Sequence, residues 1–176
     1  MSTVAANKPE SNEFVPYYSK YISLVRDGDV VSTLRQQLDN SLSLLRGISE
    51  EKANSRYAPD KWSVKEVVGH VLDTERIFGY RALRFARNDQ TPLNGFEQDD
   101  YVRAANFGKI RLSDLADEFQ NVRQANIHLF RSLDDAAWLR RGAANENEVS
   151  VRALAYIIAG HELHHMGILK TKYLQS

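Results

Sequence analysis

Apolar residues recur at helical spacing in four long stretches of the chain. In the first stretch they lie three or four positions apart, as on the buried face of an amphipathic helix: Val31, Leu34, Leu38, Leu42 and Leu45. The same spacing returns in three later stretches, and no segment shows a convincing strand pattern. With their capping residues, the stretches cover 29–47, 63–87, 113–133 and 150–174. This pattern predicts an all-α four-helix bundle with short extra helices in its connections.

Start and stop signals support these boundaries. Ser63 and Glu66 have the spacing of a capping box, in which each side chain accepts a hydrogen bond from the other residue's backbone N–H. Asp29 and Ser150 are placed to cap the first and last helices, and Gly47 is typical of a helix end. We therefore expect the second and fourth helices to begin next to Ser63 and Ser150.

The connections differ in length and composition. Residues 1–16 are small and polar and contain two prolines, so we expect a flexible lead-in before a single domain over 17–176. A short helix is expected within 17–25. The connection 88–111 is long for a compact domain, and we expect a short helix near 99–105. Loops of this length often form a lid or a wall of a binding site.

Composition narrows the class of protein. Lys+Arg and Asp+Glu both number 23, so the net charge is zero, which argues against nucleic acid as the main partner. The chain has no cysteine and hence no disulfide, thiolate ligand or thiol nucleophile. No apolar run approaches the roughly 20 residues of a membrane span, and the N-terminus lacks the apolar core of a signal peptide. A cytoplasmic protein without a membrane partner is the default expectation.

The last predicted helix carries two histidines where leucines would be expected. At about 100° per residue, His161 and His165 share one face, roughly 80° wide, with Leu154, Ile158 and Leu169. A buried imidazole without a partner costs roughly 1–3 kcal/mol. Two imidazoles four residues apart point the same way, which suits two adjacent positions in the coordination shell of a metal. The alternative is a pair of core histidines with ordinary hydrogen-bond partners.

Two known metal signatures fit this stretch poorly. Residues 161–165 match H-E-x-x-H, but the longer protease form requires glycine and histidine where this chain has Ile168 and Thr171. The shorter form takes a third ligand from a later helix, and the chain ends at Ser176. A di-iron carboxylate bundle needs a second Glu-x-x-His on another helix, which is lacking. A mononuclear site with an upstream third ligand remains.

Three other histidines are available as that third ligand. Helical phase turns His128 away from the core, and it takes His164 off the face that His161 and His165 share. His70, on the helix that begins at the capping box, is left. Glu75 lies at the centre of that helix's apolar face. It is either the partner of an arginine in a core ion pair or a carboxylate that supports or serves a site.

Two segments resemble the DinB-like (YfiT-like) proteins. Residues 62–70 have the form W-S-x-x-E-V-x-x-H, and residues 160–167 are similar to the closing H-x-x-x-H helix of that family, within a likeness that extends over about 34–174. The resemblance implies a bundle of up-down-down-up order. It also implies a divalent metal, often zinc or nickel, held by three histidines at His70, His161 and His165. Members include thiol-dependent S-transferases and proteins described as metal-dependent hydrolases, and many form dimers.

These observations together predict a metal-dependent enzyme that acts on a small molecule. An open coordination position would hold either a water, whose pKa falls towards about 7, or the thiolate of a low-molecular-weight thiol. Glu75 is the candidate for a supporting carboxylate or general base. The alternative is a non-catalytic bundle with a structural metal, or a stress-associated binding protein. A cavity at the metal would favour the enzyme, and a fourth protein ligand would favour the structural site.

Overall fold

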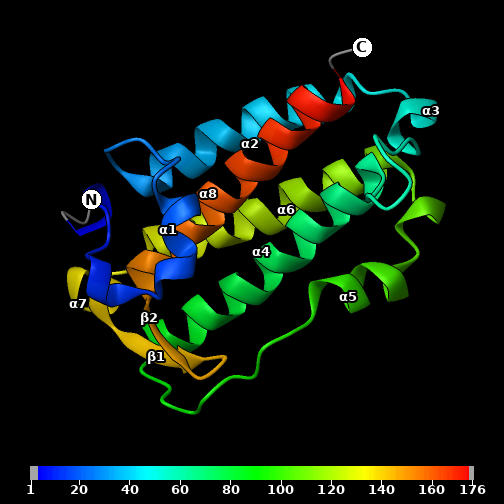
Figure 1. The fold of residues 1–176 in the computed structure, drawn as a ribbon. Coiled ribbons are helices and arrows are strands. Elements are labelled where there is room, and N and C mark those ends of the chain that lie inside the picture. Colours follow the sequence, from blue (N-terminus) through cyan, green and yellow to red (C-terminus); the bar gives the residue numbers. More distant parts are fainter. Residues whose placement is uncertain (1–3, 175–176) are drawn as a thin grey trace.

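The computed structural model describes residues 4–174. Its four long helices are α2 (Val30–Arg46), α4 (Val64–Ala86), α6 (Leu112–Arg131) and α8 (Val151–Ile168), as Figure 1 shows. The short helices are α1 (Ser19–Ile22), α3 (Glu50–Ala53), α5 (Gln98–Ala105) and α7 (Asp135–Leu139). Single 3-10 turns cover Val4–Ala6, Ser11–Glu13, Pro16–Tyr18 and Phe107–Lys109, and α8 continues as a π-turn over Leu169–Tyr173. The expected all-α four-helix bundle is confirmed.

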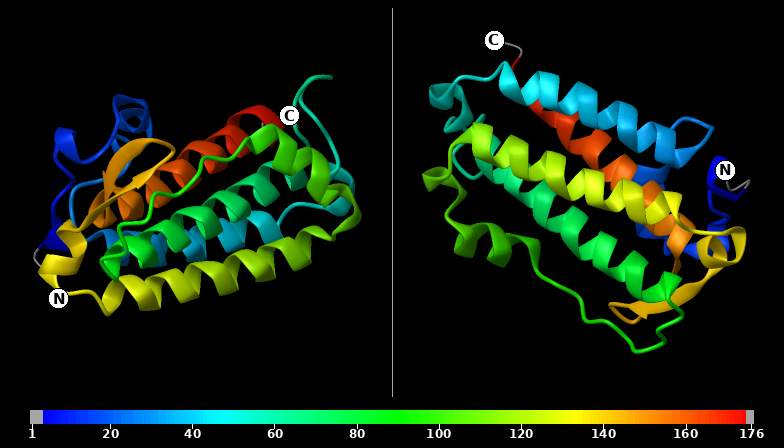
Figure 2. Two further views of the ribbon diagram at one scale, coloured as in Figure 1. Left: turned by 90° about the horizontal axis from the view of Figure 1, so that it is seen from below. Right: turned by 180° about the vertical axis from the view of Figure 1, so that it is seen from behind.

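The long helices follow an up-down-down-up order. In Figure 1, α2 and α8 run in one direction along the bundle, while α4 and α6 run in the other. Both α2 and α4 pack against α6 and α8, so consecutive helices are not always neighbours. Because α4 and α6 are parallel neighbours, the chain must return along the length of the bundle between them. Residues 87–111, which include α5, make this return along the outside (Figure 2).

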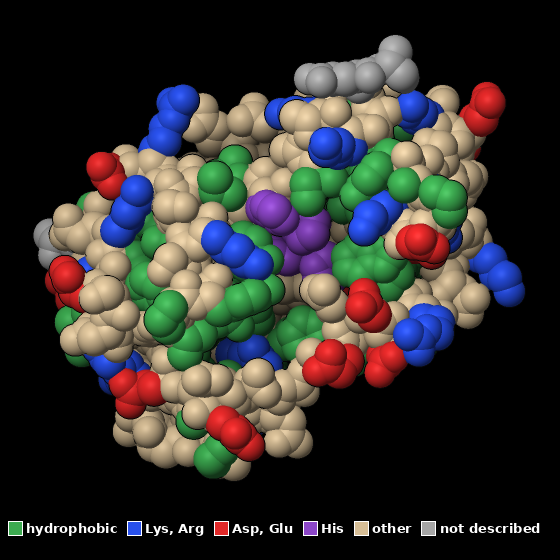
Figure 3. Space-filling view, in the orientation of Figure 1, with side chains coloured by type: hydrophobic (Ala, Val, Ile, Leu, Met, Phe, Trp, Pro, Cys, Tyr) green, Lys and Arg blue, Asp and Glu red, His purple; other side chains and the backbone are tan. Residues whose placement is uncertain are grey.

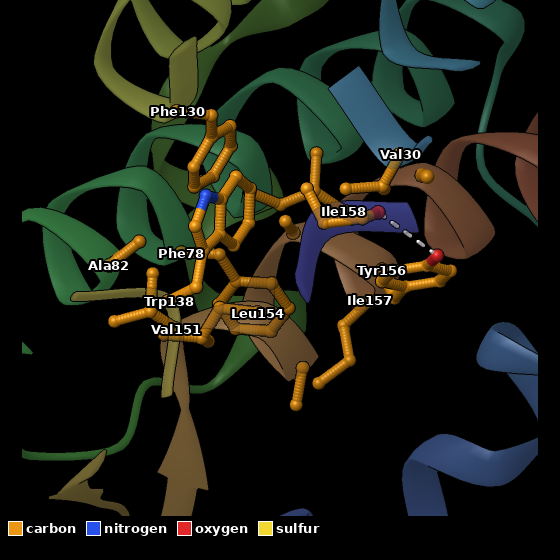
Figure 4. Close-up of a cluster of buried hydrophobic side chains, with 14 of the residues drawn as sticks. Val30, Phe78, Ala82, Phe130, Trp138, Val151, Leu154, Tyr156, Ile157 and Ile158 are labelled. Carbon is orange, nitrogen blue, oxygen red and sulfur yellow. Dashed lines mark hydrogen bonds between the residues drawn. The ribbon is translucent and has the colours of Figure 1, made fainter. Parts of the chain in front are cut away.

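Apolar side chains form two buried clusters along the bundle. The larger cluster contains aromatic residues from several elements, among them Phe78, Phe85, Phe130, Trp138 and Tyr156, and Figure 4 shows part of it. The second cluster contains Leu72, Leu115, Phe119, Met166 and Leu169. Burying each large apolar side chain stabilises the fold by roughly 1.5–3 kcal/mol. The histidines of α8 lie between the parts of the helix that enter these two clusters.

The capping residues that the sequence indicates are in place. The Ser63 hydroxyl accepts a hydrogen bond from the Glu66 N–H at 3.3 Å, and a Glu66 carboxylate oxygen accepts one from the Ser63 N–H at 2.6 Å. Asp29 caps α2 and Ser150 caps α8. Each cap satisfies a backbone donor that the first helical turn leaves free. The starts of α2, α4 and α8 are therefore set by local sequence, as predicted.

One prediction about secondary structure was wrong, since the structure contains a small β-hairpin. Strand β1 (Arg141–Ala144) pairs antiparallel with β2 (Asn147–Ser150). The two turn residues between the strands, Asn145 and Glu146, both have positive φ, at 52° and 61°. Hairpin turns with positive φ at both central residues usually carry glycine, and each strand is only four residues long. The local signal for a strand was therefore weak.

Part of the segment expected to form the lead-in, within the described residues 4–16, packs against the bundle. Glu13 is buried, and its carboxylate accepts a hydrogen bond from the Ser150 hydroxyl at 2.6 Å and forms an ion pair with Arg152 of α8. Residues 1–3 lie outside the described residues. This contact is invisible in the sequence because its two partners lie far apart along the chain. Among the described helices, none is both long and apolar enough to cross a membrane.

Candidate metal centre

Three histidine side chains from two helices converge inside the bundle. His70 comes from α4, and His161 and His165 come from α8, which is the antiparallel neighbour of α4. The His161 Nε2 atom lies 3.1 Å from the Nε2 of His70 and 3.1 Å from the Nε2 of His165. Ligand atoms of all three residues lie within 4.8 Å of one another. This is the constellation that helical spacing and the family resemblance had indicated.

Aromatic side chains and a close helix contact hold the rings in place. The Trp62 ring lies against the His70 ring, with centroids 4.8 Å apart, and Tyr21 of α1 meets the His161 ring edge-on at 5.3 Å. A Cβ atom at Gly160 would overlap the backbone of Tyr21. Only glycine therefore allows α1 to approach α8 this closely. Neither contact was predicted from the sequence: Tyr21 is remote from His161 in the chain, and Trp62 lies outside the helix that carries His70, so no helical periodicity relates them.

Burial keeps the three imidazoles in their neutral form. It lowers the pKa of His70 to about 4 and that of His165 to about 3, and it lowers the pKa of His161 well below 6.5. The negative charge of Asp99 opposes the shift at His70 without reversing it. At neutral pH each ring therefore offers the uncharged nitrogen that a metal ion binds.

Hydrogen bonding among the rings cannot account for their arrangement. A neutral imidazole nitrogen either carries a proton or has one in-plane lone pair. The Nε2 of His161 therefore serves as a hydrogen-bond partner to His70 or to His165, but not to both in good geometry. A cation at the centre of the three nitrogens would satisfy all of them at once. The donor set fits a divalent ion that accepts imidazole ligands.

Comparison with known proteins agrees with this geometry. The profile of the DinB superfamily matches residues 33–169. The chain belongs to the DinB superfamily. Its fold is similar to that of YfiT from Bacillus subtilis, which is described as a probable metal-dependent hydrolase with an unusual four-helix bundle topology. The two chains share 15% identity at a TM-score of 0.69, over 95% of this chain and 94% of that one. A search of the curated proteins gave no match.

The remaining histidines of this DinB-superfamily chain lie outside the cluster. His128 is exposed on α6, as its helical phase predicted. His164 is half-buried, and its ring contacts Tyr21 and His165 with centroid separations of 5.4 and 5.0 Å. It does not belong to the group of nearby ligand atoms. Among the described residues, no fourth histidine or carboxylate joins that group.

Glu75 lies in a separate buried cluster, centred on Arg123 of α6. The Arg123 Nε and Nη2 atoms donate to the two carboxylate oxygens of Glu75 at 2.6 and 2.8 Å, and Nη1 lies 2.7 Å from a carboxylate oxygen of Glu162. This is the core ion pair that was one of the two roles predicted for Glu75 from the sequence. Glu162 lies about 100° around α8 from His161, yet it is also only 1% exposed. The helices packed around α8 bury it on that side as well.

Burial and charge act in opposite senses within this cluster. Burial alone would lower the pKa of Arg123, but the charges of Glu162 and Glu75 outweigh it and raise that pKa. Burial raises the pKa of Glu162, against the effect of Arg123. We call Glu75, Arg123 and Glu162 the arginine cluster, and His70, His161 and His165 the histidine cluster.

The histidine cluster adjoins a cavity of about 290 Å³. His70 and His161 form part of its wall, with aromatic residues of the N-terminal segment and residues 95–99 of the long connection opposite them. A second cavity of about 300 Å³ meets His165 and Trp62. The space-filling view shows histidine side chains reaching a hollow that hydrophobic side chains border (Figure 3). Residues 95–99 thus form the wall of a cavity at the site, one of the two roles expected for the 88–111 connection.

Proposed function

We propose that this protein is a metal-dependent hydrolase of small molecules. Its divalent metal would be held by His70, His161 and His165. The observation that carries the proposal is the convergence of three neutral imidazole nitrogens next to a cavity, from the buried His70 and His161 and the half-buried His165. When bound there, a zinc-like ion supplies a Lewis acid and an ionised water at neutral pH. A fourth protein ligand would close a structural site, and none is found among the described residues.

The side chains around the histidines prepare the site for this chemistry. Because the three imidazoles are neutral, they leave the full charge of the ion available to polarise a substrate. Trp62 and Tyr21 limit the rotation of the His70 and His161 rings. The aromatic side chains in the cavity wall offer a packing surface for an apolar part of a substrate. Glu75 is held by Arg123 and lines neither cavity at the histidines, so we assign it a positioning role in place of a general base.

Support for hydrolysis comes from the description of YfiT as a probable metal-dependent hydrolase with this fold. Thiol transfer would need a metal ion held by the same three histidines, which would stabilise the thiolate of an external thiol. The chain itself has no cysteine, so a thiol would have to be a cosubstrate. Zinc and nickel are both compatible with three imidazole ligands. We propose zinc or nickel as the native ion, and an assay of both reactions decides between hydrolysis and transfer.

The decisive experiment is metal analysis of untagged protein reconstituted with zinc or nickel. The wild type is expected to bind one ion per chain, and His70→Ala, His161→Ala and His165→Ala are expected to lose it. The matched control is His128→Ala, which removes an exposed imidazole and is expected to retain the metal. Full metal content in all three cluster variants would reject the site.

The loaded protein is then assayed against a panel of small amides and esters, and separately for thiol transfer with several low-molecular-weight thiols. Metal-dependent cleavage supports the proposal. Transfer without cleavage would replace hydrolase by transferase while leaving the metal site intact. Activity of neither kind in a protein that holds its metal would favour the structural alternative.

A further inference from the structure

The cavity beside the histidine cluster contains a buried arginine without a carboxylate partner. Arg81 of α4 is 5% exposed, and its Nη2 donates to the Asn94 carbonyl at 2.9 Å. Its guanidinium lies 5.4 Å from the ring centroid of Phe78 and 5.9 Å from that of Phe96. Among the described residues, no carboxylate oxygen lies within ion-pair distance of it. Burial lowers the pKa of Arg81.

Charges that are nearly buried are normally paired. The other deeply buried arginine of the bundle, Arg123, has two carboxylates around it. Arg152 of α8 likewise has Glu13. Arg81 therefore departs from the pattern of this protein, and it does so where it lines the cavity that the histidines share. A guanidinium with unused donors at a cavity wall is suited to an anionic ligand.

A second polar group in the same cavity has no partner. Thr74 is 3% exposed, and its hydroxyl makes no hydrogen bond within the described structure. Leaving a buried hydroxyl unpaired costs about 1–3 kcal/mol. Thr74 lines the cavity together with His70 and Arg81. A ligand with a polar group at this point would supply the missing hydrogen bond.

His70, Thr74 and Arg81 form one stripe along α4. At about 100° per residue, the three positions fall within roughly 40° of one another on the helix. At about 1.5 Å per residue, Thr74 lies roughly 6 Å and Arg81 roughly 16 Å from His70 along the helix axis. Helical side chains lean towards the N-terminus, so the long Arg81 side chain shortens the latter gap. A ligand roughly 10 Å long would reach from Arg81 past Thr74 to the histidines.

The charges around the cavity select for a ligand with a single negative charge. Glu97 and Asp99 also line the cavity, but both are exposed, so water screens them. They nevertheless disfavour a dianion such as a phosphate ester, for which a lone guanidinium provides too little compensation. A carboxylate matches the planar fork of one arginine. The aromatic wall, which includes Tyr17, Tyr18 and Phe96, suits an apolar body.

We propose that this cavity binds a small monocarboxylate, with its carboxylate on Arg81 and a polar group, such as an amide or ester carbonyl, on Thr74. Its far end would face the three histidines. The assignment of that end as the reacting end rests on the proposed hydrolase function. The carboxylate subsite itself rests only on Arg81, Thr74 and the cavity.

The test is calorimetric titration of metal-free wild-type protein with hippurate, which carries a carboxylate, an amide and a phenyl ring, and with its neutral counterpart hippuramide. Hippurate is expected to bind at least about tenfold more tightly, as for a charge-assisted hydrogen bond to a partly desolvated arginine. Equal affinities, or no saturable binding of hippurate, would overturn the proposal. Phosphate and acetate serve as competitors, and displacement by phosphate at lower concentration than by acetate would overturn the assignment of a carboxylate.

Variants then assign the binding to residues. Arg81→Met is expected to weaken hippurate about tenfold or more and to leave hippuramide unchanged, while Arg81→Lys retains part of the affinity. The matched control is Arg87→Met, which removes the exposed arginine at the C-terminal cap of α4. This variant is expected to bind hippurate like the wild type. Undiminished hippurate binding by folded Arg81→Met would contradict the proposal.

Thr74→Val gives a readout that a structural role would not produce. Because the hydroxyl has no partner, replacing it by a methyl group is expected to leave the melting temperature unchanged or raise it, while hippurate binds several-fold more weakly. Weaker binding together with lower stability would point to a structural hydroxyl and count against the subsite.

The failures of the two proposals can be told apart. Hippurate binding that depends on Arg81 in a protein that never takes up metal would support the subsite and reject the hydrolase. Stoichiometric metal on the histidines with no preference for hippurate over hippuramide would support the metal site of the proposed hydrolase and reject the carboxylate subsite.

Discussion

The arginine cluster and the histidine cluster are both polar and both buried between helices, yet they differ in how their groups are paired. In the arginine cluster, each charged group has an oppositely charged partner within 2.8 Å. In the histidine cluster, the Nε2 of His161 lies between two other ring nitrogens and can form a hydrogen bond in good geometry with only one of them. The first cluster lies in the closed core, and the second adjoins cavities. The arginine cluster, whose charges are all paired, stabilises the fold. The histidine cluster, whose nitrogens are not all paired, is the one that we propose binds a metal ion.

The arginine cluster connects all four long helices. Arg123 belongs to α6, Glu75 to α4 and Glu162 to α8, and Arg123 also donates to the Leu34 carbonyl of α2 at 3.1 Å. The Ser41 hydroxyl of α2 donates to Glu162 at 2.6 Å. Because Glu162 follows His161 directly, the cluster also fixes the rotation of α8 about its axis. The histidines thus face the cavity partly because their neighbour is held on the other side.

The largest predicted effect follows from removing the central charge of the arginine cluster. Arg123→Ala would leave two buried carboxylates without a cation, and we expect a loss of about 3–5 kcal/mol in the free energy of unfolding, measured by urea denaturation. The control is Arg46→Ala, which breaks an exposed ion pair with Asp117 and should change stability by less than about 1 kcal/mol. Similar losses in the two variants would show that the arginine cluster stabilises the fold no more than an exposed ion pair does.

The histidine cluster, in contrast, should stabilise the protein only when it binds a metal ion. Zinc at a hundred times its Kd is expected to add about 2.7 kcal/mol to the stability of the wild type. His161→Leu should lose this response, and the metal-free variant should be at least as stable as the metal-free wild type, since leucine removes a poorly paired polar group. Thermal melts with and without zinc provide the measurement. A variant that zinc stabilises as much as it does the wild type would place the ion elsewhere.

Glu75→Gln tests which cluster Glu75 serves. The amide keeps the shape of the side chain but removes one of two charges around Arg123, so we expect a loss of about 1–3 kcal/mol in stability. Metal content should remain stoichiometric, and the hydrolytic rate should fall no more than the folded fraction does. A large fall in kcat in a well-folded variant would instead support a general-base role for Glu75.

The smallest effect is expected at the edge of the arginine cluster. Ser41→Ala removes one hydrogen bond to Glu162 and should cost about 1 kcal/mol, measured by urea denaturation. Removing that bond also takes away an interaction that lowers the pKa of Glu162. Metal binding should not change, because Ser41 touches none of the three histidines. A loss of metal from Ser41→Ala would show that the two clusters are coupled more tightly than their geometry indicates.

Local sequence was sufficient to predict the long helices, and it indicated the three histidines as candidate ligands. Periodicity and capping residues mark helix starts because both act within a few residues of the helix end, as at Ser63 and Ser150. His161 and His165 could be paired because one helix sets their spacing. His70 followed once helical phase had excluded His128 and His164. Arg81 and Thr74 share the phase of His70, and that spacing was the signal that could have drawn attention to them.

The sequence by itself determined where each long helix begins and which side chains share a face, since backbone hydrogen bonds and side-chain direction in a helix depend on near neighbours. Tertiary structure alone decided which charges meet: Glu75 with Arg123, Glu162 with Arg123, and Glu13 with Arg152. It also decided that residues 141–150 form a hairpin and that Arg81 has no carboxylate partner among the described residues. The physical reason is that pairing and burial depend on distances between segments remote in the chain, which no local pattern encodes.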